Sequence, residues 1–177
     1  MDDKKYWIGF NLIKGIGTVR MQNLVAYFGD LESAWNADAK ELAESGLGAK
    51  LVEKVVGARK DINLNQVWAK IEAQGIKIVT WADEEYPNRL REIDQPPPIL
   101  YIRGEYLQDD LFAVAIVGTR KVTAYGRQVT EEIASFLASN GITVISGLAR
   151  GVDAIAHQTA LRVGGRTIAI LGSGVDK

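Results

Sequence analysis

Three short glycine-rich segments are the parts of this sequence best suited to bind an anion. They are Gly118-Thr119-Arg120-Lys121, the segment from Gly147 to Asp153, and Gly172-Ser173-Gly174, and each follows a run of apolar residues. Glycine lets the backbone approach an anion closely, and the N–H groups at the start of a following helix attract negative charge. Arginine and lysine add charge-assisted hydrogen bonds to phosphate oxygens. The chemistry indicated is phosphate binding.

We call the surface that these segments are expected to form the phosphate ledge. Its candidate residues are Gly118, Thr119, Arg120, Lys121, Gly147, Arg150, Gly151, Gly172 and Ser173. The alternative is that these glycines only serve the turns of an α/β fold. No Gly-x-Gly-x-x-Gly and no Gly-x-x-x-x-Gly-Lys-Ser/Thr follows a strand, so neither a dinucleotide nor a P-loop triphosphate is indicated.

The elements that must position the ledge alternate regularly along the second half of the chain. Apolar runs predict strands, and amphipathic stretches predict helices between them, in the order strand 112–117, helix 123–140, strand 143–146, helix 153–162 and strand 167–171. Continuous apolar strands separated by helices predict an α/β fold with a parallel sheet covered on both faces. In such a sheet every strand-to-helix loop lies at the carboxyl edge, where ligands bind.

The first 75 residues predict a separate helical domain. Glycine-apolar-glycine turns recur as Gly15-Ile16-Gly17 and Gly46-Leu47-Gly48, each followed by a helical run. The repeat is similar to a helix-hairpin-helix pair (a helix-hairpin-helix/SAM-like domain), a motif whose backbone N–H groups grip DNA phosphates. The alternative is a helical bundle whose turns merely need glycine.

Strand character begins at 76–81, and Pro96-Pro97-Pro98 leads as an extended segment into a strand at 99–102. We therefore expect a helical domain at 1–75 and a Rossmann-like α/β domain at 76–177. The charge follows a similar division: residues 1–75 carry ten basic and ten acidic side chains, 76–110 carry four and eight, and 111–177 carry seven and four. The ledge therefore belongs to the basic part of the chain.

Composition restricts the class of protein. Cysteine is absent and there is one histidine among 177 residues, which argues against thiol catalysis, disulfides and a metal or other cofactor site. We find neither a signal peptide nor an apolar run long enough to cross a membrane, so a cytoplasmic location is expected.

Asp153 and His157 stand four residues apart on one helix, which predicts a structural hydrogen bond between them and an N-terminal cap by Asp153. A triad with Ser146 lacks the nucleophile elbow.

Six short sequence segments occur in a fixed order along the chain. They are Tyr86-Pro87-Asn88-Arg89-Leu90, Pro97 to Gly104, Ala115-Ile116-Val117-Gly118-Thr119-Arg120, Tyr125-Gly126-Arg127, Ser146 to His157 and Thr167 to Gly174. Together they resemble the DprA family of DNA-processing proteins, also called Smf. The resemblance covers essentially the whole chain.

The resemblance implies a non-enzymatic, cytoplasmic, dimeric protein that binds and protects single-stranded DNA and loads a RecA-type recombinase onto it during natural transformation. It assigns Gly118, Thr119 and Arg120 to the family's strand-binding element and Arg150 to a basic loop position. Tyr125 is the nearest aromatic residue for stacking an unpaired base.

This chain ends at Lys177, where family members continue, so we expect a fragment or a truncated protein with an apolar sheet edge. Two other functions stay open. Nucleotide phosphoribohydrolases have a similar architecture, although their Pro-Gly-Gly-x-Gly-Thr loop is absent here. The helical domain is also a candidate for gripping duplex DNA.

Overall fold

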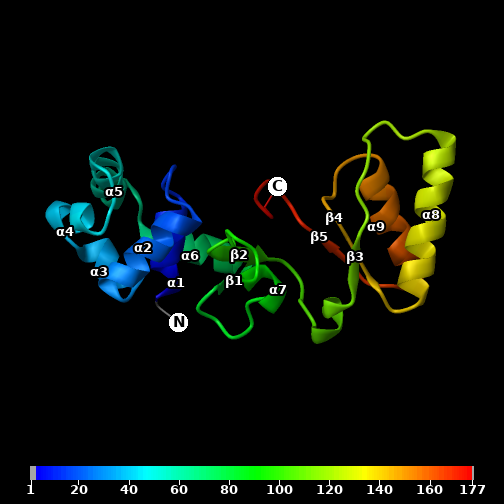
Figure 1. The fold of residues 1–177 in the computed structure, drawn as a ribbon, viewed down its shortest axis with the longest axis horizontal. Helices are drawn as coiled ribbons and strands as arrows, with labels where there is room; N and C mark the ends of the chain where they lie inside the picture. The colour runs from blue at the N-terminus through cyan, green and yellow to red at the C-terminus, as the bar shows by residue number, and fades with distance from the viewer. Residues whose placement is uncertain (1–2, 177) are drawn as a thin grey trace. The chain divides into compact units, whose positions relative to one another are not determined.

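The computed structural model describes residues 3–176, apart from the side chains of residues 108 and 109. The chain divides into two compact units, one ending at Arg103 and the other beginning at Gly104, which we call the helical unit and the sheet unit. Figure 1 shows helices preceding a small hairpin in the first, and a parallel sheet with helices in the second. The predicted fold class, a helical domain followed by a partial Rossmann-like sheet, is confirmed.

Helices dominate the helical unit because short apolar clusters at helical spacing alternate with strong capping residues. Asp38 and Glu41 form a capping box at one of these helices. The helices bury an apolar core that includes Ile8, Phe10, Met21, Leu24, Leu42 and Val55. Their bounds are α1 Lys4–Asn11, α2 Thr18–Phe28, α3 Leu31–Asn36, α4 Ala39–Glu44, α5 Ala49–Asp61 and α6 Leu64–Ala73.

The glycine repeat forms two turns, one between α1 and α2 and one between α4 and α5. Gly15 has φ +107° and Gly46 has φ +89°, values that favour glycine. Ile16 and Leu47 are buried beside them, as expected for side chains that fill the space between helices. The first turn contacts α5, because the Lys54 Nζ atom donates to the Lys14 carbonyl oxygen at 3.1 Å.

The strands β1 Lys77–Thr80 and β2 Ile99–Ile102 pair antiparallel, with Ile78 opposite Tyr101, and the short helix α7 Asn88–Arg91 lies between them in the chain. This hairpin packs on the helices: Trp7 meets Trp81 edge to face at 5.4 Å, and Lys4 forms an ion pair with Asp83 at 3.0 Å. The compact helical unit therefore runs to Arg103, whereas sequence composition changes at residue 76.

In the sheet unit, β3 Ala113–Ala115, β4 Thr143–Ser146 and β5 Thr167–Ala169 form a parallel sheet in the order β3-β4-β5. The crossover helices are α8 Ala124–Ser139 and α9 Val152–Arg162, and the short 3-10 helix η1 Gln108–Leu111 precedes β3. β3 and β5 are shorter than the predicted strands, and β4 has the predicted bounds.

Both crossover helices lie on the same face of the sheet, so the expectation of helices on both faces is wrong for the described residues. Ala134 and Ala138 of α8 pack with Val144 and with Ala156 and Ala160 of α9 in one buried cluster. The strands follow in spatial order, and two right-handed crossovers in one direction place both helices on one side. Figure 1 shows α8 and α9 together on that side.

A buried carboxylate connects the amino-terminal ends of the strands β4 and β5. Asp110 is 4% exposed, and its carboxylate accepts hydrogen bonds from Thr143 Oγ1 at 2.9 Å and from Arg166 Nε at 2.5 Å. Burial raises the pKa of Asp110, but the hydrogen bonds from Arg166, Leu107 and Thr143 outweigh it and hold that pKa below its ordinary value. Among the described residues, no helix is long and apolar enough to cross a membrane.

Candidate nucleic-acid interface

The loops after β3 and β4 are in direct contact at the carboxyl edge of the sheet. Gly151 has φ +90°, and a Cβ atom placed on it would lie 2.3 Å from the Thr119 carbonyl oxygen and 2.7 Å from Arg120 Cα. The Val152 N–H donates to that same carbonyl oxygen at 3.2 Å. Only glycine permits this approach at this φ value, so Gly151 joins the backbone of Arg120 to the loop that carries Arg150.

A second close approach supports the first. A Cβ atom on Gly118 would lie 2.7 Å from Cγ2 of Val152, the first residue of α9. Two glycines from different loops therefore bring the segment after β3 against the start of α9. These contacts place the predicted strand-binding segment beside the predicted basic loop, as the ledge requires.

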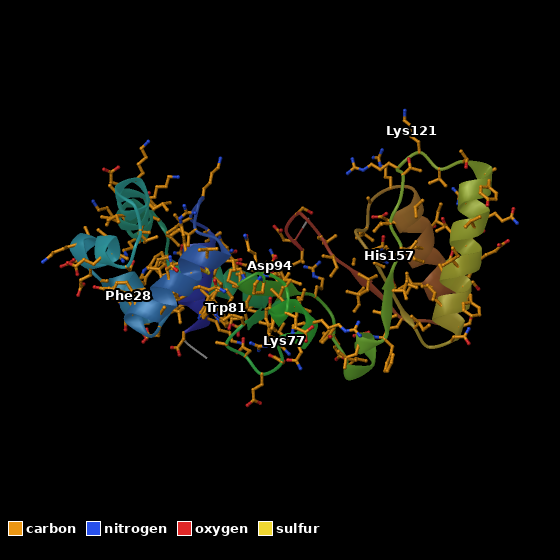
Figure 2. The ribbon with its side chains drawn as sticks, viewed as in Figure 1. Phe28, Lys77, Trp81, Asp94, Lys121 and His157 are labelled. Carbon is orange, nitrogen blue, oxygen red and sulfur yellow. The ribbon has the colours of Figure 1, made fainter. Side chains whose placement is uncertain are left out.

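Hydrogen bonds within the segment after β3 set the direction of its backbone. The Lys121 N–H donates to Thr119 Oγ1 at 3.1 Å, and the Thr119 hydroxyl in turn donates to the Lys121 carbonyl oxygen at 3.3 Å. Thr123 caps α8 by accepting from the Gly126 N–H at 3.1 Å. Figure 2 shows Lys121 at the outer end of this loop, with its side chain pointing away from the unit.

Asp153 is buried, and its position differs from the helix cap expected from sequence. Its Oδ2 atom accepts from the Gly147 N–H at 3.1 Å and from the Ala149 N–H at 3.4 Å. The N-cap of α9 is Gly151, because Asp153 lies within the first turn and reaches back under the preceding loop. Asp153 therefore fixes the loop that carries Arg150.

The predicted hydrogen bond between Asp153 and His157 is replaced by separate partners. His157 Nδ1 lies 2.6 Å from Thr167 Oγ1, whose own proton goes to the Val144 carbonyl oxygen. Burial lowers the pKa of His157, and the nearby Asp153 carboxylate only partly opposes this shift. Figure 2 shows His157 among the elements of the sheet unit. Ser146 Oγ donates to the Ile116 carbonyl oxygen at 2.6 Å, which directs its hydroxyl away from a nucleophilic role.

Exposure agrees with a surface role for the candidate residues. Arg120, Lys121 and Arg150 are exposed, and Tyr125, in the first turn of α8, is 77% exposed. Gly172 and Ser173 are exposed and follow β5 at the same edge, and their part in the ledge stays a prediction from strand order.

One N–H group at the start of each crossover helix is not free, which corrects the expectation of free N–H donors at those two positions. The Val152 N–H and the Gly126 N–H both have partners within the unit. These two N–H groups are therefore already engaged, whereas the cationic side chains of Arg120, Lys121 and Arg150 are exposed.

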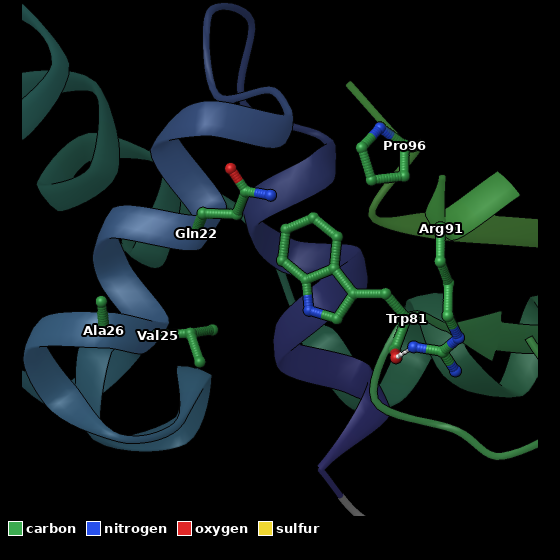
Figure 3. Close-up of a pocket in the computed structure, with 6 residues that line it drawn as sticks. All are labelled: Gln22, Val25, Ala26, Trp81, Arg91 and Pro96. Carbon is green, nitrogen blue, oxygen red and sulfur yellow. Dashed lines mark hydrogen bonds between the residues drawn. The ribbon is translucent and has the colours of Figure 1, made fainter. Parts of the chain in front are cut away.

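The helical unit holds a separate open groove of about 400 Å³. Figure 3 shows the Trp81 indole between helix α2 and Pro96. The Arg91 guanidinium donates to the carbonyl oxygens of Trp81 and Asp83, which leaves it committed to the backbone. The lining residues are Gln22, Val25, Ala26, Trp81, Arg91 and Pro96. Within residues 3–176 no group of three His, Cys, Asp or Glu side chains is arranged to hold a metal ion.

Comparison with known proteins gives a consistent result. Residues 77–177 match the family model for DNA recombination-mediator protein A. The Smf protein of Synechocystis is 40% identical over 98% of this chain and 45% of its own length. The chain spans about half the length of the curated relatives that it matches.

Two solved structures share the fold. DNA processing protein A from Streptococcus pneumoniae aligns with a TM-score of 0.77 at 27% identity, over 100% of this chain and 60% of its own. DNA processing protein A from Helicobacter pylori, studied for its unique single-stranded DNA binding mode, aligns with a TM-score of 0.50 at 37% identity, over 57% of this chain and 45% of its own.

Proposed function

Because this chain belongs to the DNA recombination-mediator protein A family, we propose that its sheet unit binds single-stranded DNA along the phosphate ledge. Arg120, Lys121 and Arg150 supply the positive charge for successive phosphates. Such contacts hold a strand by its backbone and carry no sequence information of their own. The proposal is one of binding and involves no catalytic step.

The observation that carries the proposal is the contact between Gly151 and the backbone of Thr119 and Arg120. It brings cationic loops from two different crossovers to one edge of the sheet. Had the two arginines belonged to opposite ends of the unit, a single sugar-phosphate chain could not meet both. The single-stranded DNA binding of the Helicobacter pylori protein, which aligns with this chain over 57% of it, supports the same conclusion.

The wider role that we propose follows the family. It comprises a cytoplasmic location, a homodimer, protection of the bound strand and the loading of a RecA-type recombinase during natural transformation. The curated relatives Smf of Synechocystis and Smf of Escherichia coli are about twice as long as this chain. The chain would contribute the strand-binding part of that role.

The experiment measures the affinity of the full chain for a fluorescent oligothymidylate across a series of salt concentrations. Arg120→Ala and Arg150→Ala should each weaken binding and flatten the plot of log affinity against log salt by roughly 0.7, the single-strand value for one lost phosphate contact. The matched control is Arg162→Ala, because Arg162 is also exposed but lies in the last turn of α9, at the far end of that helix from Gly151. Unchanged affinity in both ledge variants would refute the proposal.

A further inference from the structure

Leu148 has a backbone conformation that its residue type disfavours. Its φ is +56°, and among the described residues no other residue except glycine has a positive φ. An L-residue with a Cβ atom is strained in this region, where glycine or asparagine would be relaxed. The side chain is 55% exposed, so burial of the leucine does not compensate for the strain.

The surrounding loop holds Leu148 in place. The N–H groups of its two neighbours, Gly147 and Ala149, both donate to the Asp153 carboxylate. The Ala149 carbonyl oxygen accepts from the Ala154 N–H at 3.1 Å, which fastens the loop to α9 a second time. Leu148 is thus an exposed apolar residue on a firmly held loop. A strained residue that the surrounding structure maintains is a reason to look for a function.

The neighbourhood of Leu148 combines exposed apolar side chains with exposed cations. Extending the register by two residues between β3 and β4 and by one residue between β4 and β5 sets Val117 and Ile170 on either side of Gly147. These two residues are 74% and 62% exposed. Arg150 follows Leu148 by two residues, and Gly151 touches the backbone of Arg120. The edge therefore presents an apolar surface and positive charge together.

A single nucleic-acid strand carries both complementary features, because its phosphates are anionic and its unpaired bases expose apolar faces. A duplex presents its phosphates but keeps the base faces stacked inside. We propose that Leu148 contacts the face of an unpaired base while Arg120 and Arg150 hold the adjoining phosphates. Apolar side chains serve this purpose for bases displaced from a stack. The inference rests on the proposed function and extends it, because it makes the ledge selective for strands that carry accessible bases.

The experiment compares two fluorescent probes of equal length with the full chain: oligothymidylate and a strand of abasic deoxyribose-phosphate units. The wild-type chain should prefer oligothymidylate by about fivefold, since each stacked base adds to affinity. Leu148→Asn tolerates the same backbone conformation and should bring this preference close to one, with an unchanged salt slope. Leu148→Met, which keeps the apolar contact, should retain the preference.

Arg150→Ala separates this inference from the proposed function. It should flatten the salt slope and leave the preference for bases intact. Equal binding of both probes by the wild-type chain would overturn the inference and leave the proposed function standing. An undiminished preference of Leu148→Asn for oligothymidylate would have the same consequence. Failure of the wild-type chain to bind either probe would overturn both.

Discussion

Substitution of Gly151 by alanine tests whether the contact between the two loops holds the ledge together. At φ +90° the new Cβ atom is strained at a cost of about 1 to 2 kcal/mol. It would also lie 2.3 Å from the Thr119 carbonyl oxygen, so the loops must separate, and this breaks the hydrogen bond from the Val152 N–H. Loss of that bond adds about 1 kcal/mol. Together with the displaced packing at Val152, these effects should lower the free energy of unfolding of the sheet unit by about 3 kcal/mol.

Gly164→Ala is the matched control. Gly164 has φ +73° at the end of the same helix, and a Cβ atom there would meet nothing within 4 Å. Gly164→Ala therefore introduces only backbone strain, and the lower entropy of the unfolded alanine chain partly offsets it. We expect its free energy of unfolding to fall by about 1 kcal/mol.

Hydrogen exchange of α9 amides and urea unfolding followed by circular dichroism measure the difference between the two variants. All four tryptophans belong to the helical unit, so their fluorescence should be unchanged in both. Equal destabilisation by Gly151→Ala and Gly164→Ala would refute the contact.

Four further results are expected. Asp110→Asn should lower the free energy of unfolding by about 2 kcal/mol at pH 7, because it breaks a buried charged network. The folded pKa of Asp110 lies below 3.8, so the carboxylate stabilises the fold above that pH. In an acid titration, the difference from wild type should disappear as the pH falls through the folded pKa. His157 is the one histidine of the chain, and its folded pKa lies below 6.5, so the free energy of unfolding of the wild-type chain should fall as the pH drops below about 6.5. His157→Asn should remove this decrease from the plot of unfolding free energy against pH. An unchanged plot would contradict a buried neutral imidazole. Lys14→Ala with Lys50→Ala should leave oligothymidylate affinity unchanged, whereas a selective loss of duplex binding in a gel-shift assay would assign duplex contact to the glycine turns of the helical unit. Incubation with nucleoside monophosphates should release no free base by chromatography, and release would revive a phosphoribohydrolase function.

Hydrophobic periodicity predicted most of the fold, because the strands and helices of the sheet unit are determined by the residues within them and by the capping residues at their ends. The predicted helix 123–140 is α8 within one residue at each end, since Thr123 caps it and Gly141, at φ +74°, ends it. Three features depended on contacts distant in sequence and could not be read locally. They are the packing of the β1-β2 hairpin on α1, the burial of both crossover helices on one face of the sheet, and the hydrogen bonds from Thr143 and Arg166 to Asp110.

The contact between the loops of Arg120 and Arg150 was predictable from sequence, but the hydrogen bonds beneath them were not. Strand order alone placed the loops of Arg120 and Arg150 at one edge. Sequence could not reveal that the Asp153 carboxylate occupies the inner side of the Arg150 loop, because an aspartate at that position equally suits a helix cap. Nor could it reveal Leu148, whose strain is a property of φ and has no signature in residue type.

The distribution of hydrogen bonds determines which groups remain to attract a phosphate. The Val152 N–H at the start of α9 donates to Thr119, and the buried Asp153 carboxylate adds a negative charge within the first turn of that helix. Both features weaken the helix start as an anion site, because its field falls off within one turn and a nearby anion opposes it. Beside the start of α9, the attraction should then come from the exposed side chains of Arg120, Lys121 and Arg150. Strand affinity should consequently depend on salt in proportion to the number of cations engaged, rather than persist as a salt-resistant backbone contact.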